Sequence, residues 1–252
     1  MANKPLLHLD NVTLATRTNP SLVSGVSFQV EAGESIGLIG ESGSGKSLTL
    51  RSIIGLLPSG IEQAGGKIEL NGRCAMIFQD PIRALDPLYP VVKQLAEVVH
   101  FRQQVSRKAS RTIALELLEL LGLPDSLKGK DRYPHQLSGG QCQRIVIAMA
   151  LACKPDLLLC DEPTTALDVT VQRQILDLII RLQKELGYAT VFVTHNLAVA
   201  SSLCSRLYVM KEGKIVEHGD TLPLLQNPQH SYTRMLINSV LPLPELERSA
   251  ES

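Results

Sequence analysis

Tryptophan is absent from this sequence, and aromatic residues of every kind account for only 4% of it. The chain of 252 residues has no excess of either charge, because 25 basic residues balance 25 acidic ones. Proteins that bind nucleic acid or an anionic membrane surface directly usually carry a basic patch or a positive net charge. We therefore expect no nucleic-acid partner and no electrostatic attachment to lipid.

Long apolar runs are missing too. The longest, residues 145–153, lies between Arg144 and Lys154, and it falls far short of the roughly 20 residues that cross a bilayer as a helix. Residues 1–10 lack the apolar region of a signal peptide. Any role at a membrane is therefore expected to depend on partner proteins.

None of the five cysteines forms a C-x-x-C pair, which argues against a metal knuckle or a redox motif. Their odd number and irregular spacing favour reduced thiols in a reducing compartment. Cys153 and Cys160 lie among apolar residues, and we expect both in the core.

Strand and helix signals alternate along most of the chain. Periodicity of two and short apolar runs predict strands, and apolar spacing of three and four residues predicts helices. Strands are expected at 6–14, 26–30, 35–39, 67–70, 75–78, 157–160, 190–194, 207–210 and 215–216; helices are expected at 46–57, 141–154 and 169–186, with another that stops at Gly122. The dipeptides Asn71-Gly72 and Glu212-Gly213 predict hairpins.

This order of elements predicts an α/β fold with a mainly parallel sheet, an N-terminal antiparallel β lobe and a helical subdomain. We assign residues 1–79 to the β lobe and the first half of the core, and residues 80–150 to the helical subdomain. Residues 151–238 are the expected second half of the core. The segment 239–252 is rich in Pro and Glu and is expected to be a loose tail.

A glycine-rich segment follows the expected strand 35–39. It reads Gly40-Glu41-Ser42-Gly43-Ser44-Gly45-Lys46-Ser47 and matches the pattern G-x-x-x-x-G-K-[ST] between a strand and a helix. Such a loop points backbone N–H groups at phosphate oxygens, Lys46 reaches the β and γ phosphates of ATP, and Ser47 ligates Mg²⁺. The alternative is a glycine-rich turn that carries Lys-Ser by chance.

Two acids end the buried strand 157–160. At the carboxyl edge of a sheet, beside a phosphate loop, Asp161 is placed to hold Mg²⁺ and Glu162 to polarise the attacking water. The alternative, which the loop makes less favourable, is a pair of exposed acids that cap the next helix.

A second helix N-terminus suited to phosphate is found at Leu137-Ser138-Gly139-Gly140-Gln141. The helical insert separates it from the first loop, so one ATP cannot easily use both ends of one chain. The arrangement predicts two chains head to tail, with each ATP between one phosphate loop and the other chain's Ser138–Gln141 segment.

With these motifs the chain resembles an ABC ATPase over almost its whole length, which implies a P-loop NTPase (RecA-like) core with an ABC-specific helical subdomain. The resemblance implies that Gln79 contacts Mg²⁺ and links to the membrane subunit, and that Asp168, in Ala166-Leu167-Asp168, contacts the opposite subunit. It also implies that His195 senses the γ-phosphate.

Partners follow from the same resemblance. They are a second, paralogous ABC ATPase subunit, two membrane permeases and, indirectly, a substrate-binding protein, and the chain is expected to lie peripherally at the cytoplasmic face of a bacterial inner membrane.

Two positions depart from the family pattern. The family stacks an aromatic ring on adenine after its first strand, but Ala15 and Thr16 stand there, with no aromatic residue nearby. Stacking of this kind contributes roughly 1–3 kcal/mol, so weaker adenine contacts are expected. Asn196 also replaces a common Asp after His195, and we do not expect this change to abolish hydrolysis.

Several strings resemble the peptide/nickel importer family in particular: residues 78–81, 133–138, 147–152 and 161–171, and the element Asn227-Pro228-Gln229-His230-Ser231-Tyr232-Thr233. Peptide subunits usually carry a cysteine-containing C-terminal extension and a longer segment between residues 72 and 78. Because the chain shows neither feature, nickel or a metal–chelate complex is the favoured cargo, and di- or oligopeptides are the alternative.

Proteins of three other classes share part of this pattern. An ABC ATPase that works without a permease, on DNA or ribosomes, would need a coiled-coil insert or a second cassette. A P-loop kinase or a GTPase would lack the Ser138–Gln141 segment. A non-catalytic cassette would normally show a damaged motif, but Lys46, Glu162 and His195 are all present.

Overall fold

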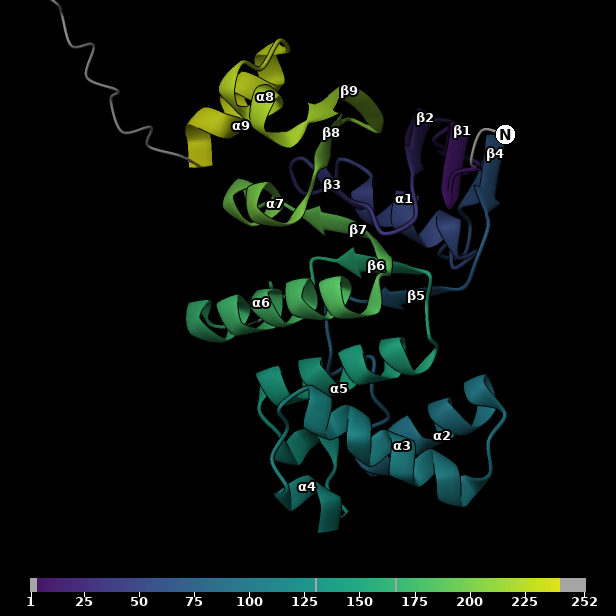
Figure 1. Ribbon diagram of the computed structural model, residues 1–252. Coiled ribbons are helices and arrows are strands. Elements are labelled where there is room, and N and C mark those ends of the chain that lie inside the picture. Colours follow the sequence, from purple (N-terminus) through teal and green to yellow (C-terminus); the bar gives the residue numbers. More distant parts are fainter. Residues whose placement is uncertain (1–3, 130, 166, 241–252) are drawn as a thin grey trace, which may run out of the picture.

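A computed structural model describes residues 4–129, 131–165 and 167–240 (Figure 1). Ala166, the first residue of the predicted subunit contact, and residues 241–252 of the predicted tail lie outside these ranges. Within them, every helix is too short or too polar to span a lipid bilayer. The predicted division of the chain at residues 79, 150 and 238 stays a prediction.

The first strands form an antiparallel sheet of three strands in the order β2-β1-β4. They are β1 (Leu7–Ala15), β2 (Val23–Val30) and β4 (Glu62–Leu70). Apolar side chains of β1 and β2 turn alternately into a core that also contains Ile36 and Leu50. The predicted antiparallel β lobe is therefore confirmed.

The second sheet has six strands in the order β5-β6-β7-β3-β8-β9, of which only β9 is antiparallel to its neighbour. The strands are β3 (Ser35–Ile39), β5 (Cys74–Ile77), β6 (Leu157–Asp161), β7 (Ala189–Thr194), β8 (Arg206–Lys211) and β9 (Lys214–Asp220). Every residue of β6 and β7 is buried, as expected for parallel strands covered on both faces. The predicted α/β fold class is confirmed, as is the hairpin at Glu212-Gly213.

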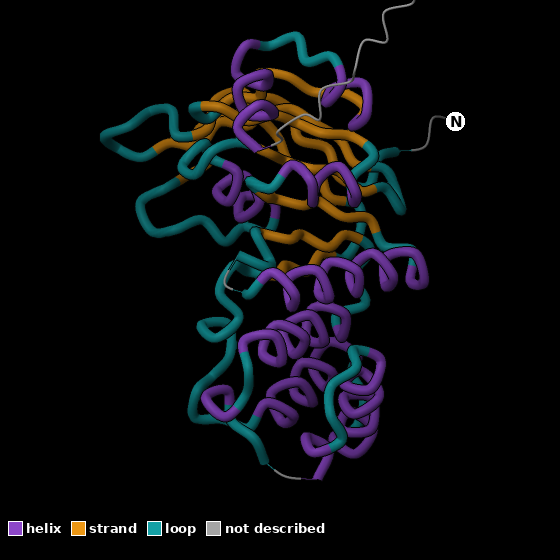
Figure 2. The backbone as a smooth tube through the Cα atoms, turned by 90° about the vertical axis from the view of Figure 1, so that its left-hand side faces the viewer, coloured by secondary structure: helices purple, strands orange, loops and turns teal. Residues whose placement is uncertain are grey.

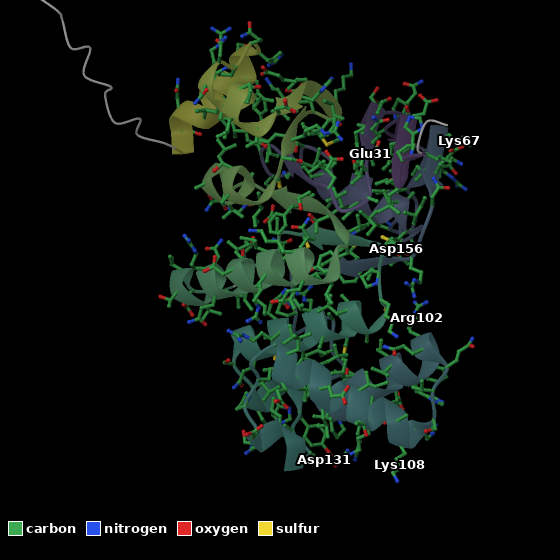
Figure 3. The ribbon with its side chains drawn as sticks, viewed as in Figure 1. Glu31, Lys67, Arg102, Lys108, Asp131 and Asp156 are labelled. Atoms are coloured by element: carbon green, nitrogen blue, oxygen red, sulfur yellow. The ribbon has the colours of Figure 1, made fainter. Side chains whose placement is uncertain are left out.

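The hairpin predicted at Asn71-Gly72 is wrong, because β4 and β5 belong to different sheets. β4 pairs with β1, and β5 pairs in parallel with β6. Asp156, labelled in Figure 3, accepts a hydrogen bond of 2.7 Å from the backbone N–H of Arg73. Because of these long-range contacts, the chain passes from one sheet to the other between β4 and β5. The Asn71-Gly72 dipeptide predicts only the local turn.

Helices form the lower end of the molecule and cover the larger sheet (Figures 1 and 2). They are α1 (Lys46–Ile53), α2 (Val91–Gln103), α3 (Arg107–Leu120), α4 (Ser126–Gly129), η1 (Pro134–Gln136), α5 (Gly139–Ala152), α6 (Val169–Leu186), α7 (Leu197–Leu203), α8 (Thr221–Gln226) and α9 (Ser231–Val240). α2, α3 and α5 pack on one another, with Leu95, Leu118 and Ile145 among their buried side chains. Cys160 is buried as predicted, whereas Cys153 is only half-buried.

Two of the helix boundaries that differ from the prediction do so for clear local reasons. α1 ends at Ile53 rather than residue 57, because Gly55 has a φ of 69° and the N–H groups of Gly55 and Leu56 bond back to Ser52 and Arg51. α5 starts at Gly139, two positions before Gln141, since Ser138 caps it.

Candidate functional site

The phosphate loop joins β3 to α1 and carries three glycines with positive φ: Gly40 (150°), Gly43 (82°) and Gly45 (104°). A side chain at Gly40 would collide with the carbonyl oxygen of Met210 in β8. One at Gly45 would lie 2.7 Å from the end of the Met210 side chain. The glycines therefore supply both the backbone conformation and the close approach of the loop to β8.

Lys46 is buried and folds back onto the loop that it follows. Its ammonium group donates to the carbonyl oxygens of Gly40 (2.8 Å) and Glu41 (2.7 Å). Burial lowers the pKa of Lys46, and the nearby carboxylates, chiefly Glu162, act in the opposite direction. A cation satisfied by neutral carbonyls in this way can transfer to phosphate oxygens at little cost in hydrogen bonds.

Ser47 and Asp161 meet at the carboxyl end of β6. The Ser47 hydroxyl donates a hydrogen bond of 2.7 Å to Oδ1 of Asp161, whose residue is only 1% exposed. Burial raises the pKa of Asp161, and the hydrogen bond from Ser47 partly offsets that shift. A hydroxyl and a carboxylate this close fit Mg²⁺, which prefers oxygen ligands and is usually held by one or two carboxylates.

Glu162 has a φ of 45°, in the left-handed region that a non-glycine residue rarely adopts. Its N–H donates to the carbonyl oxygen of Val193 in β7, 3.0 Å away, which keeps the residue tied to the sheet as it turns away from β6. Strained backbone of this kind persists where the surroundings impose it, and it often accompanies function.

The carboxylate of Glu162 is the centre of a polar cluster. Its Oε2 accepts from the hydroxyl of Thr165 (2.8 Å) and the amide of Gln79 (3.4 Å), and Nδ1 of His195 lies 3.3 Å away. Gln79, Glu162 and His195 follow the adjacent strands β5, β6 and β7. Thr165 was missed in the sequence analysis, although it stands in the string 161–171 that was noted there.

A pocket of about 690 Å³ lies over the loop. It is lined by most of the loop, by Gln79, Glu162, Thr165 and His195, and by two apolar residues, Leu22 and Leu236. Leu22 comes a few residues after Ala15 and Thr16, the positions where an aromatic residue was expected. Leu236 belongs to α9, which none of the sequence motifs had linked to the site. The structure thus brings the predicted catalytic residues Gln79, Glu162 and His195 into one cavity with most of the predicted phosphate loop.

The Ser138–Gln141 segment does not line this pocket. The Ser138 hydroxyl accepts from the N–H of Gln141 (3.2 Å), and the Gln141 side chain accepts from the N–H of Ser138 (3.1 Å), so the two form a capping box. Asp168 likewise caps α6, accepting from the N–H of Val171 at 2.9 Å. Ser138 and Asp168 are both exposed.

The two caps lie close together. A Cβ on Gly140 would be 2.6 Å from a methyl carbon of Val171 in α6, and one on Gly139 would be 3.3 Å from Leu167. The glycines therefore allow the start of α5 to pack against the start of α6. One surface of the chain carries both segments that were predicted to face another subunit.

Comparison with known proteins identifies the class. The family model described as ABC transporter matches residues 23–165. A probable peptide ABC transporter ATP-binding protein of Sinorhizobium fredii is 44% identical over 91% of this chain and 73% of its own length. The dipeptide transport ATP-binding protein DppD of Escherichia coli is 41% identical over 91% of this chain and 74% of its own length.

The fold gives the same answer. A solved ATP-binding cassette, dimeric in a post-hydrolysis state with ADP and phosphate bound, has a TM-score of 0.74 and 29% identity, covering 85% of this chain and 98% of its own. The chain therefore belongs to the ABC transporter family as an ATP-binding subunit, and its activity is ATP hydrolysis coupled to transport. The kinase, GTPase and permease-free alternatives are not supported.

The comparisons and the sequence prediction disagree about the transported substrate. Three of the relatives are named as peptide, dipeptide or oligopeptide transport proteins. These names support the peptide alternative rather than nickel, which the sequence analysis had favoured. The features on which the nickel prediction depended were the short segment between residues 72 and 78, which contains β5, and the expected absence of a cysteine-containing C-terminal extension.

Proposed function

We propose that this chain is the ATP-hydrolysing subunit of an importer for di- or oligopeptides. The observation that carries the catalytic part is the position of Glu162, whose carboxylate faces the phosphate-loop pocket between Gln79 and His195. The names of the relatives support the cargo class.

In this proposal Glu162 is the general base. It accepts a proton from water as the water oxygen attacks the γ-phosphorus, and the bond from that phosphorus to the ADP oxygen breaks. The hydrogen bond from Thr165 orients the carboxylate. His195, with its side chain 59% exposed, is free to contact the γ-phosphate, and Gln79 reports that contact to the membrane partner.

Lys46 exchanges the carbonyl oxygens of Gly40 and Glu41 for phosphate oxygens when ATP enters. Ser47, Asp161 and Gln79 are the residues that would hold Mg²⁺. The metal ion, when bound, would neutralise charge on the β and γ phosphates. The hydrogen bond between Ser47 and Asp161 keeps both ligands aligned before that happens.

The second ATP contact comes from another subunit. Ser138, Gly139, Gly140 and Gln141 lie outside the phosphate-loop pocket, so they serve the ATP of a facing chain, and Asp168 contacts that chain beside them. The partner is a paralogous ATPase. Two permeases and a binding protein complete an importer, with this chain at the cytoplasmic face of the membrane.

Uptake in a deletion strain tests the proposal. Cells lacking this gene are expected to lose uptake of labelled dipeptide and to regain it with the wild-type gene but not with Glu162→Gln. Uptake of radioactive nickel, measured in the same cells, is expected to stay unchanged. Loss of nickel uptake with normal dipeptide uptake would replace the peptide assignment by the nickel one.

A further inference from the structure

The phosphate loop has a contact that none of its motifs accounts for. The phenol oxygen of Tyr232, in α9, accepts a hydrogen bond of 3.0 Å from the backbone N–H of Glu41. The two residues are 191 positions apart in the chain, and Tyr232 is only 4% exposed. The contact joins the C-terminal segment directly to the first turn of the loop.

The geometry of the peptide bond makes this contact informative. The N–H of Glu41 and the carbonyl of Gly40 belong to one planar trans peptide group, so they point in opposite directions. The carbonyl accepts from Lys46, and the N–H donates to Tyr232. The group is therefore held at both ends, on one side by the phosphate-binding lysine and on the other by α9.

Gly40 places little steric restriction on its own backbone, so this peptide group is free to rotate unless other contacts hold it. Such a rotation would disturb the loop. It would turn the Gly40 carbonyl, a negative dipole, to a new direction beside the phosphate site. The hydrogen bond to Tyr232 opposes that rotation. Its role grows when ATP enters, since Lys46 then leaves the carbonyl and Tyr232 is the remaining partner of the group.

Tyr232 is itself held in place. The ammonium of Lys211 lies 5.0 Å from the centre of its ring, a cation–π contact. At the start of α9, the carboxylate of Glu217 in β9 accepts from the N–H groups of Gln229 (2.7 Å) and His230 (3.1 Å). The N–H of Tyr232 donates to Nδ1 of His230 at 3.2 Å. A continuous set of contacts therefore runs from β9 to the loop.

We propose that Tyr232 is a positioning residue for ATP binding, whose hydroxyl keeps the Gly40–Glu41 peptide group in the orientation that the phosphate loop needs. The assignment gives a purpose to the 227–233 element, which the sequence analysis noted only as a mark of lineage. It rests on the role of the loop in binding ATP, as in the proposed function.

Tyr232→Phe tests this, because it removes the hydroxyl and keeps the ring. In the purified full chain, titrated with a fluorescent ATP analogue and Mg²⁺, we expect a roughly three- to tenfold increase in Kd, the effect of one lost hydrogen bond. In the assembled transporter, KM for ATP should rise by a similar factor, while kcat stays within about twofold.

Tyr188→Phe is the matched control. Tyr188 is 3% exposed, and its hydroxyl donates to the carbonyl oxygen of Ile179 (3.2 Å), away from the phosphate loop. It should lose a similar amount of stability in urea without any change in Kd or KM. If Tyr232 had only a structural role, Tyr232→Phe and Tyr188→Phe would both lose stability in urea and both leave Kd and KM unchanged.

Three results would overturn the inference or separate it from the proposed function. Unchanged Kd and KM in a folded Tyr232→Phe protein would overturn it. If Tyr232→Phe does not fold, Glu217→Ala is the second test, because it releases the start of α9. Glu217→Ala should also raise Kd for the ATP analogue, and an unchanged Kd would overturn the inference. A wild-type chain that binds no ATP would instead disprove the proposed function.

Discussion

Ser47 donates a hydrogen bond of 2.7 Å to Asp161 across 114 positions of sequence. The bond joins the first turn of α1 to the end of β6, two elements that contact each other. In the larger sheet, β7 separates β6 from β3, the strand that leads into the loop. The bond places a hydroxyl and a buried carboxylate beside the same phosphate loop. The behaviour of this pair, and of the groups around it, can be measured.

Asp161→Asn should lower the rate of ATP hydrolysis without lowering the stability of the fold. Burial raises the pKa of Asp161, so the folded chain holds a proton at pH values where the unfolded chain has released it. Stability therefore falls as pH rises from the ordinary aspartate pKa through the raised one, and the ionised side chain destabilises the fold at neutral pH.

In Mg²⁺-free buffer at pH 7 the Asn variant should accordingly melt at the same temperature or higher. Its Mg²⁺-dependent hydrolysis should fall by on the order of a hundredfold or more. Thermal unfolding and phosphate release measure the two effects. Asp177→Asn, which alters only an exposed ion pair with Arg173, should change neither, and a less stable Asp161→Asn protein would contradict the argument.

Glu162→Gln should leave ATP binding close to normal and slow hydrolysis by about 10²- to 10⁴-fold, because an amide cannot accept the proton of the attacking water. Titration with a fluorescent ATP analogue and a phosphate-release assay on the assembled transporter measure the two quantities. Glu62→Gln, an exposed change in β4, is the control. Normal turnover in the Gln variant would remove Glu162 as the base.

Lys46→Ala should weaken nucleotide binding itself, since it deletes the cation that reaches the phosphates. We expect Kd for the fluorescent analogue to rise roughly ten- to a hundredfold, as for the loss of charge-assisted hydrogen bonds. Lys184→Ala, at the exposed end of α6, should bind as the wild type does. Equal affinities of the two variants would exclude the proposed role of Lys46.

Gly140→Ala should reduce hydrolysis in the assembled transporter without altering ATP binding by the isolated chain. The new Cβ would lie 2.6 Å from a methyl carbon of Val171, and this stiff β-branched side chain has little room to move. The start of α5 would then shift on the surface that we propose faces the second subunit. Hydrolysis rates report the loss.

Val171→Ala provides the matched test, because it removes the methyl group that Gly140→Ala would meet. The double variant should recover much of the lost activity. Activity that stays low in the double variant would show that the cause is not this contact.

Local sequence patterns predicted the elements that local physics controls. The strand Ser35–Ile39 and the helix Val169–Leu186 were predicted with the bounds that the structure has. A short apolar run marks the strand, and the structure adds that Asp168 caps the helix. The glycine spacing from Gly40 to Gly45 similarly predicted the phosphate loop. In these segments the interactions that decide the conformation lie within a few residues of one another.

Tertiary structure decided the rest. Asn71-Gly72 did not make a hairpin, because β5 pairs with β6 and β4 pairs with β1 in another sheet. Glu162 meets Gln79 and His195 only because the strands order as β5-β6-β7. Tyr232 reaches Glu41 from the far end of the chain. Sheet order and helix docking depend on the burial of surfaces that are distant in sequence, and no local pattern contains that information.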